Sequence, residues 1–227
     1  MSDLLNLFPL SVLRDRIELA PTYREDLIAR VLKMRESHPE KTKGATWTGD
    51  VNGYEYLHRD EAFEPLFQKL AQPVRGYLSA LALDAAKFRI HFTRSWATVS
   101  LGSERIAPHR HEQSHLSLSY YLKKPAQSGA LRFHQQNPPN QFMPRLLSPR
   151  MMEAGIAERH TPLNATVVSL DPAEGEVVIF PSQTEHSTMP NLGNEPRISI
   201  AIDIVLTLRD SAHYDAGLPD PSTWKRY

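Results

Sequence analysis

Residues 107–124 read APHRHEQSHLSLSYYLKK, and the second half of this stretch alternates apolar and polar side chains. An alternation with a period of two is typical of a β-strand whose two faces meet different surroundings. The stretch EPRISIAIDIV, residues 195–205, repeats this pattern with four isoleucines on one face. Both segments therefore predict strands with one apolar face, which can pack under other elements, and one polar face.

Helical patterns precede the strands. Residues 21–39 predict a helix, because Thr22 and Glu25 fit a capping box and Pro39 can close it. Residues 60–83 carry an apolar stripe at helical spacing, and Pro73 is expected to kink or split this second helix. After residue 86 the apolar period changes from 3.6 to 2. The segments expected to form strands are 88–92, 96–101, 116–122, 130–133, 166–170, 176–180 and 198–206.

Helices followed by many strands predict an α+β protein, in which a helical layer packs on one sheet of an antiparallel sandwich or barrel. A chain of 227 residues that is 41% hydrophobic can bury one sizeable core, so we expect a single domain. Its expected parts are a helical layer over 1–86, a β core over 87–206 and a C-terminal tail over 207–227. Residues 134–164 are rich in Pro, Asn and Gln, and this long connection is predicted to be either a cover over a substrate or a disordered insertion.

The composition of the chain limits the classes of partner and ligand that we expect. Basic and acidic residues balance at 26 each, and no basic run is interleaved with aromatics, so we expect no nucleic-acid partner. No window approaches the roughly 20 apolar residues of a membrane span, and the N-terminal stretch lacks a basic leader region, so we expect a cytoplasmic protein with no membrane partner. Because the chain has no cysteine, any bound metal must be held by nitrogen and oxygen ligands.

Histidines suggest such a metal site. His109 and His111 are two residues apart, so on an extended backbone both imidazoles project from one face. The strand-like run GEVVIFPSQTEHSTMPN, residues 175–191, delivers His186 after a proline turn. Two ligands from one strand and a third from a distant strand can hold a metal and leave other positions open. A surface or core role is the alternative for each histidine, because this region is rich in them.

The polar faces of the two long strands suggest an anion site. Arg197, Ser199 and Asp203 alternate with the isoleucines and point to the interior if the sheet closes into a barrel. A buried guanidinium keeps its charge, so Arg197 needs an anion there. The alternative is an internal salt bridge with Asp203 or Glu195. Tyr121 could donate its hydroxyl to the same anion, or it could be an ordinary half-buried strand tyrosine.

The ordered set of H-x-H, LSLSYYLKKPAQSGALRF, GEVVIFPSQTEHSTMPN and RIS resembles the Fe(II)/2-oxoglutarate-dependent dioxygenases. It is most similar to a small bacterial and phage 2OG-Fe(II) oxygenase subfamily and more distantly similar to prolyl hydroxylases. The resemblance covers roughly residues 96–204. It implies a double-stranded β-helix (jelly roll, cupin-like) with N-terminal helices packed on one sheet, and it implies Fe(II), 2-oxoglutarate and O2 as cofactor and cosubstrates.

The resemblance also implies site residues. His109 and His186 match the iron histidines, Arg197 and Ser199 match the family's R-x-S pattern that binds the C5 carboxylate of 2-oxoglutarate, and Tyr121 matches a cosubstrate-binding tyrosine. These residues are expected to share one cavity.

One position departs from the wider family, which usually has H-x-D or H-x-E where this chain has His111. The ligand set could be three histidines, could use Glu112 if the chain turns after His111, or could be two histidines with an open position that admits a halide. We favour His111. A neutral imidazole in place of a carboxylate leaves the site one charge unit more positive.

The implied reaction is hydroxylation of an unactivated C–H bond in a small-molecule or peptide substrate, with release of succinate and CO2. One alternative is a cupin-like metalloenzyme that uses the same three histidines without 2-oxoglutarate, and it would tolerate Arg197→Ala. The other is a non-catalytic barrel that binds a metal or a small ligand and forms no succinate.

Overall fold

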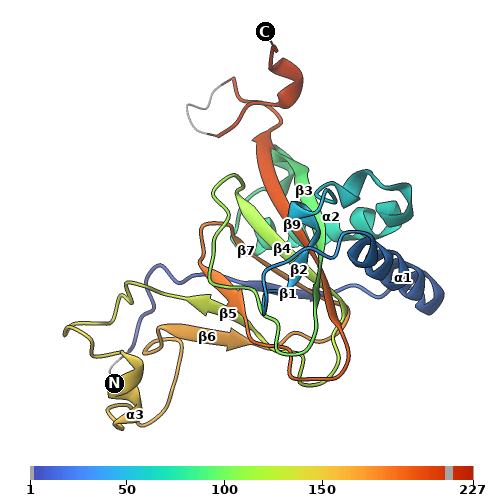
Figure 1. Cartoon of the computed structure of the whole chain (residues 1–227). Coiled ribbons are helices and arrows are strands. Elements are labelled where there is room, and N and C mark those ends of the chain that lie inside the picture. The colour runs from blue at the N-terminus through green and yellow to red at the C-terminus, as the bar shows by residue number, and fades with distance from the viewer. Residues whose placement is uncertain (1–2, 213–216, 227) are drawn as a thin grey trace.

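The computed structural model describes residues 3–212 and 217–226 of the chain (Figure 1). The helices are α1 (Pro21–Ser37), α2 (Glu64–Ala80) and α3 (Pro149–Glu153). The strands are β1 (Leu13–Arg16), β2 (Trp47–Thr48), β3 (Phe88–Ser100), β4 (Leu116–Lys123), β5 (Leu131–His134), β6 (Val167–Leu170), β7 (Glu176–Pro181), β8 (His186–Thr188) and β9 (Arg197–Leu208).

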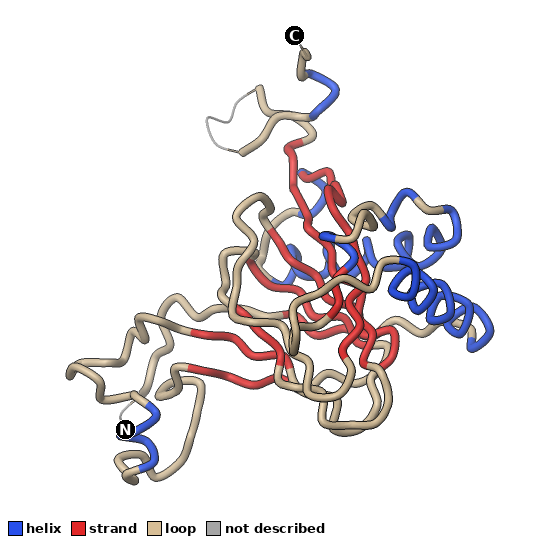
Figure 2. The backbone as a smooth tube through the Cα atoms, viewed as in Figure 1, coloured by secondary structure: helices blue, strands red, loops and turns tan. Residues whose placement is uncertain are grey.

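The strands form two antiparallel sheets. The large sheet has the order β1-β7-β4-β9-β3-β2, and the small sheet has the order β6-β5-β8. Figure 2 shows α1 and α2 together on one side of the strands, while β5 and β6 extend on the other side. The α+β prediction, with the N-terminal helices against one sheet, is therefore confirmed.

The main core lies between α1, α2 and the large sheet, because the period-two strands turn their apolar faces to the helices. Leu27 and Val31 of α1 pack in one cluster with the apolar stripe of α2 and with the isoleucines of β9. These isoleucines, Ile198, Ile200, Ile202 and Ile204, are at most 1% exposed. A second, smaller cluster around Phe133 and Phe180 joins the two sheets.

The helix ends differ from the predicted pattern. Helix α1 begins at Pro21 after Ala20, and no side chain caps it, so the capping box of Thr22 and Glu25 does not form. Pro21 itself sets the start, since its ring has the helical φ and it needs no hydrogen-bond acceptor in the first turn. Helix α2 continues through Pro73, which is buried on the core face instead of splitting the helix.

Some strands also differ. The two strands predicted over 88–92 and 96–101 form one strand, β3, with a register shift between Phe92 and Arg94. Strands β1, β2 and β8 were not predicted, because β2 and β8 have only two and three residues and β1, with the sequence LRDR, has a single apolar side chain. Their pairing partners, and not their own sequences, make them strands.

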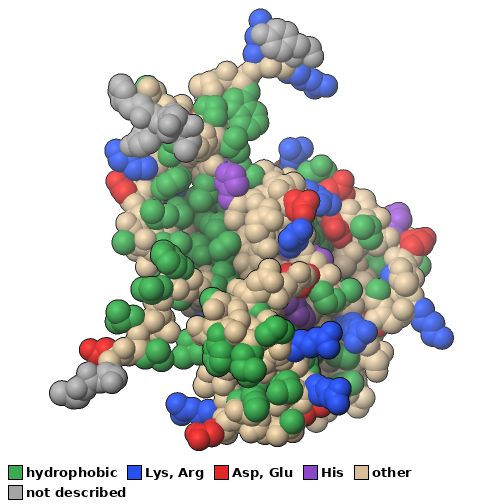
Figure 3. All heavy atoms as spheres, turned by 90° about the vertical axis from the view of Figure 1, so that its left-hand side faces the viewer, with side chains coloured by type: hydrophobic (Ala, Val, Ile, Leu, Met, Phe, Trp, Pro, Cys, Tyr) green, Lys and Arg blue, Asp and Glu red, His purple; other side chains and the backbone are tan. Residues whose placement is uncertain are grey.

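Residues 135–166 form a long excursion between β5 and β6 and contain α3. Several of its large apolar side chains are exposed, among them Phe142, Met143, Ile156 and Leu163. Figure 3 looks onto this side of the molecule and shows hydrophobic side chains gathered in several groups. In the part of the chain that is described, no helix is both long enough and apolar enough to cross a membrane.

Candidate metal centre

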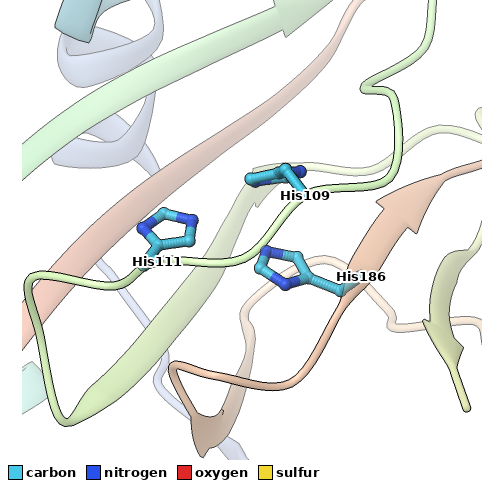
Figure 4. Close-up of side chains that lie close together, drawn as sticks. All are labelled: His109, His111 and His186. Carbon is cyan, nitrogen blue, oxygen red and sulfur yellow. The ribbon is translucent and has the colours of Figure 1, made fainter. Parts of the chain in front are cut away.

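Backbone pairing brings three histidines together. His109 and His186 form an isolated antiparallel bridge, with N–H···O distances of 3.0 and 2.8 Å between their backbones. The backbone N–H of His111 donates to the carbonyl of Ser182 at 3.0 Å, which fixes the segment beside the end of β7. One ligand atom of each imidazole lies within 4.8 Å of those of the other two. Figure 4 shows the three rings facing a common centre.

The hydrogen bonds of the rings fix which nitrogen is free. Nδ1–H of His109 donates to the carbonyl of Ala107 and that of His186 donates to the carbonyl of Thr184, both at 2.9 Å. Because a carbonyl can only accept, the proton of each ring sits on Nδ1. The Nε2 atoms of these two rings then carry the lone pairs that a metal needs.

His111 is held from two sides. Its Nδ1–H donates to Oδ1 of Asp203 at 2.6 Å, and its ring stacks on Trp96 with a centroid distance of 5.6 Å and an interplanar angle of 16°. The side chain of Glu112, in contrast, is 71% exposed and pairs with Arg110 at 3.2 Å. The chain therefore places His111 in the cluster and turns Glu112 to solvent. His111 as a metal ligand stays a prediction.

Burial keeps two of the three rings uncharged. Desolvation, helped by the neighbouring imidazoles of His109 and His111, lowers the pKa of His186 to about 3. Desolvation also lowers the pKa of His109. At neutral pH both rings are neutral, which is the form that binds a metal.

Arg197 is buried among backbone carbonyls and hydroxyls. Its side chain is 2% exposed, and Nη1 donates to the carbonyls of Ser128, Gly129 and Met189 at 2.7, 3.3 and 3.2 Å. Nη2 donates to the hydroxyls of Ser100 and Thr188 at 2.8 and 2.9 Å.

Neither predicted alternative partner forms a salt bridge with Arg197. Asp203 bonds to His111, and Glu195 pairs with Lys123. Within the described residues the buried guanidinium therefore has oxygen acceptors but forms no salt bridge with a carboxylate.

Gly129 allows the carbonyls to reach Arg197. Its φ of +87° is one that side chains disfavour, and an added Cβ would lie 2.4 Å from the carbonyl oxygen of Met189 and 2.9 Å from Nη1 of Arg197. The cradle of backbone oxygens around the guanidinium therefore requires glycine at this turn.

One cavity of about 210 Å³ is lined by all six predicted site residues, namely His109, His111, His186, Tyr121, Arg197 and Ser199. Burial raises the pKa of Tyr121 to about 12, so its hydroxyl stays a hydrogen-bond donor. Ser199 is bonded through its hydroxyl to that of Thr98 at 2.7 Å. Described residues 135–166 do not contribute to the cavity wall, so the predicted covering role of this excursion stays a prediction.

Sequence reasoning missed several residues of the cavity. Thr188, Trp96 and Asp50 line it, and Asp203 was predicted to face the interior but not to bond to His111. Oδ1 of Asp50 is buried without a partner among the described residues, while Oδ2 lies 3.8 Å from Arg94. No motif surrounds Asp50, so the sequence carries no signal for it.

Residues 94–203, slightly less than half of the chain, match the model of a family described as "Putative 2OG-Fe(II) oxygenase". This segment belongs to the 2OG-Fe(II) oxygenase family. The resemblance stated from the motifs is thereby confirmed, and Fe(II) and 2-oxoglutarate are the cofactor and cosubstrate of a domain of this family. No curated protein sequence matches the chain.

Solved structures with a similar fold include AviO1 from Streptomyces viridochromogenes Tue57, which is 18% identical over 93% of this chain and 93% of that chain, with a TM-score of 0.55. HygX from Streptomyces hygroscopicus, solved with nickel and 2-oxoglutarate bound, is 14% identical over 93% and 92%, with a TM-score of 0.52. A prolyl-4-hydroxylase from Pseudomonas putida is 13% identical over 86% and 92%, with a TM-score of 0.51. At these identities the likeness shows a common fold.

The residues present fit the two groups that a 2OG-Fe(II) oxygenase domain needs. Three imidazoles with converging ligand atoms suit a divalent metal. A buried guanidinium without a carboxylate partner, in the same cavity, suits a dicarboxylic acid.

Proposed function

We propose that this protein is a 2-oxoglutarate-dependent oxygenase that hydroxylates an unactivated C–H bond of a small-molecule or peptide substrate. The observation that carries the proposal is one cavity that holds both a cluster of three histidines and a buried arginine whose hydrogen bonds go to carbonyls and hydroxyls. We further propose that the two sheets are the halves of a double-stranded β-helix with the cavity between them.

In this proposal Nε2 atoms of His109, His111 and His186 hold Fe(II), since Nδ1 of each ring is already committed to an acceptor. When bound, the metal couples decarboxylation of 2-oxoglutarate by O2, which gives succinate and CO2, to insertion of the second oxygen atom into a substrate C–H bond. Three fixed imidazoles leave further coordination positions open to the cavity.

The other end of 2-oxoglutarate is assigned to Arg197. Its guanidinium neutralises the C5 carboxylate, and the hydroxyls of Ser199 and Tyr121 are available at the wall of the same cavity. Tyr121 keeps its proton at neutral pH and can therefore donate to a carboxylate oxygen. The oxygen cradle of Arg197 holds the guanidinium in place before the cosubstrate arrives.

Asp50 and Trp96 are candidates for the substrate end of the cavity. The carboxylate of Asp50 offers a buried acceptor without a partner among the described residues, and the indole of Trp96 offers an apolar surface beside His111. A substrate that places a hydrogen-bond donor against Asp50 would satisfy this oxygen.

The first test is an anaerobic titration of the protein with Fe(II) and 2-oxoglutarate. We expect a weak visible charge-transfer band from the chelate, and succinate after air is admitted. His186→Ala should abolish both signals, while His160→Ala, which changes an exposed histidine, should leave them intact. A wild-type protein that binds iron but gives neither band nor succinate would contradict the proposed function.

The second test separates a 2-oxoglutarate site from a metal site that ignores this cosubstrate. Wild-type protein should prefer 2-oxoglutarate to 2-oxobutanoate, which lacks the distal carboxylate, by at least about tenfold, since a buried charged hydrogen bond contributes about 1.5–3 kcal/mol. Arg197→Gln should lose this preference and keep its metal. Equal binding of the two acids by the wild type would favour the cupin-like alternative.

A further inference from the structure

Asp203 is a buried carboxylate tied to the histidine cluster. It lies on β9 and is 0% exposed. Its Oδ1 accepts hydrogen bonds from Nδ1–H of His111 at 2.6 Å and from the hydroxyl of Ser114 at 3.1 Å, and its Oδ2 accepts one from Nε2–H of Gln113 at 2.9 Å. The donors are the second histidine of the H-x-H motif and two residues that closely follow it, so one carboxylate anchors this whole segment to β9.

His111 differs from the other two histidines in the acceptor of its Nδ1–H. His109 and His186 donate to neutral backbone carbonyls two residues earlier in the chain, whereas His111 donates to a carboxylate. A carboxylate acceptor strengthens the hydrogen bond and makes Nε2 of the same ring a better electron donor. The stack on Trp96 holds the plane of the ring at the same time.

The hydrogen bond between His111 and Asp203 matters because of the other charges in the cavity. An imidazole that binds a metal is a neutral ligand, and Arg197 already adds a buried positive charge that forms no salt bridge with a described carboxylate. A divalent cation bound beside it would raise the local positive charge further, which is costly in a buried site. Asp203 is the fully buried carboxylate in hydrogen-bond contact with the cluster, and it supplies the opposite charge through His111.

We propose that Asp203 is a positioning residue for the metal, because it fixes the tautomer and orientation of His111. Through its hydrogen bond to this ligand, Asp203 also supplies the negative charge that three histidine ligands lack. The inference rests on the proposed function only in placing a metal at the histidine cluster. It predicts that the affinity and the ligand field of the metal depend on Asp203, although this side chain does not touch the metal.

The test uses Asp203→Asn, which keeps the shape and removes the charge. The amide oxygen can still accept from His111, and the amide nitrogen can face Gln113 once the side-chain amide of Gln113 turns over. Co(II) serves as the probe, since its visible bands report its ligand field. We expect about 10–100-fold weaker Co(II) binding than in the wild type, as for other groups that orient metal-ligating histidines, and shifted visible bands.

Two further variants separate this role from a general effect on folding. Ser114→Ala removes one hydrogen bond to Asp203 and leaves the charge, so it should weaken Co(II) binding only slightly. In a His111→Ala background, Asp203→Asn should add little to the loss already caused by His111→Ala, because Asp203 acts through His111. Additive losses in the double variant, or an unchanged Co(II) spectrum in folded Asp203→Asn, would overturn the inference.

A measurement on the wild type keeps the inference testable if Asp203→Asn does not fold. In Zn(II)-loaded protein with ¹⁵N-labelled histidine, His111 should show a metal-bound Nε2 and a protonated, strongly hydrogen-bonded Nδ1. A metal-bound Nδ1, or a His111 ring without metal, would refute it. If Co(II) and Zn(II) bind as expected but 2-oxoglutarate does not, the proposed function fails while the role of Asp203 stands.

Discussion

The two faces of the large sheet are built from the same strands but meet opposite demands. The helix-covered face of β9 carries isoleucines that pack against α1 and α2. The cavity face of the same strand carries Arg197, Ser199 and Asp203, which are also buried. Burying isoleucine stabilises the fold, whereas burying an arginine or a carboxylate costs free energy unless partners compensate it.

This difference predicts that residues that control stability and residues that control ligand binding lie on opposite faces of the sheet. Side chains on the helix-covered face should control the free energy of unfolding and leave ligand binding in the folded protein unchanged. Side chains on the cavity face should control metal and cosubstrate binding and contribute little to stability, or even oppose it. Variants on the two faces of one sheet test this separation directly.

The largest effect is expected for His186→Ala on the cavity face. Loss of one of three imidazoles should weaken Fe(II) binding by more than about 100-fold, beyond the ~10–100-fold cost of losing a group that only supports a ligand. The free energy of unfolding of the metal-free protein should change little. Metal titration and urea unfolding measure the two quantities. A large loss of stability without loss of metal binding would reverse the comparison.

Ile200→Ala should show the opposite profile on the helix-covered face. Ile200 is 0% exposed, so its truncation should lower the free energy of unfolding by about 2–5 kcal/mol through lost burial and a cavity. Fe(II) and 2-oxoglutarate affinities of the folded variant should match those of the wild type. The control is Val167→Ala, since Val167 is 39% exposed and should cost almost nothing.

Gly129→Ala tests the arginine cradle. The positive φ of Gly129 and the crowding of its Cβ position should together lower stability by about 1–3 kcal/mol. Because the crowding disturbs the carbonyls that hold Arg197, the affinity for 2-oxoglutarate should fall while metal affinity stays unchanged. Gly155→Ala has a similar φ of +80° with nothing within 4 Å of the new Cβ, so it should show strain without the loss of 2-oxoglutarate binding.

The smallest expected effect is a loss of stability at acidic pH. His186 has a pKa of about 3 in the folded chain and an ordinary value near 6.5 when unfolded, so between these values the unfolded chain binds a proton that the native state does not. The metal-free protein should therefore lose stability as the pH falls from 6 to 5, by up to about 1.4 kcal/mol from this residue.

His186→Gln should remove that part of the pH dependence, and His160→Gln, at an exposed position, should not. His109, His111 and His134 also face His186, so the comparison between the two variants isolates the contribution of one ring. Equal slopes of unfolding free energy against pH in wild type and His186→Gln would contradict the predicted neutral state of His186.

Much of the fold could be predicted because it depends on local periodicity. The isoleucine face of β9, the apolar stripe of α2 and the helix α1 follow from spacings within each segment. The strands β1, β2 and β8 could not be predicted, since β2 and β8 are too short to show an alternation and β1 has a single apolar side chain. Of the two outcomes predicted for Pro73, the split does not occur, since the helix continues through this buried residue, and the kink stays a prediction.

The candidate site shows the same division. The order of H-x-H, the LSLSYYL segment with Tyr121, the later histidine and the R-x-S pattern pointed to six residues, and all six line one cavity. The sequence did not predict three further residues of the cavity, Asp50, Thr188 and Trp96. Polar and aromatic residues outside a motif cannot be distinguished from ordinary loop and strand residues. Asp203 was read as a possible partner of Arg197, whereas the geometry gives it to His111.

By itself, the sequence determined which residue types face each side of the long strands, because the alternation of side chains is a property of the extended backbone. It also determined that two histidines leave the chain on one side, two residues apart. Only the tertiary structure decided which hydrogen-bond partner each polar side chain meets. His111 meets Asp203 across 92 positions of sequence, and Arg197 meets the carbonyl of Ser128 across 69, so these hydrogen bonds exist only where the sheets bring distant segments within reach.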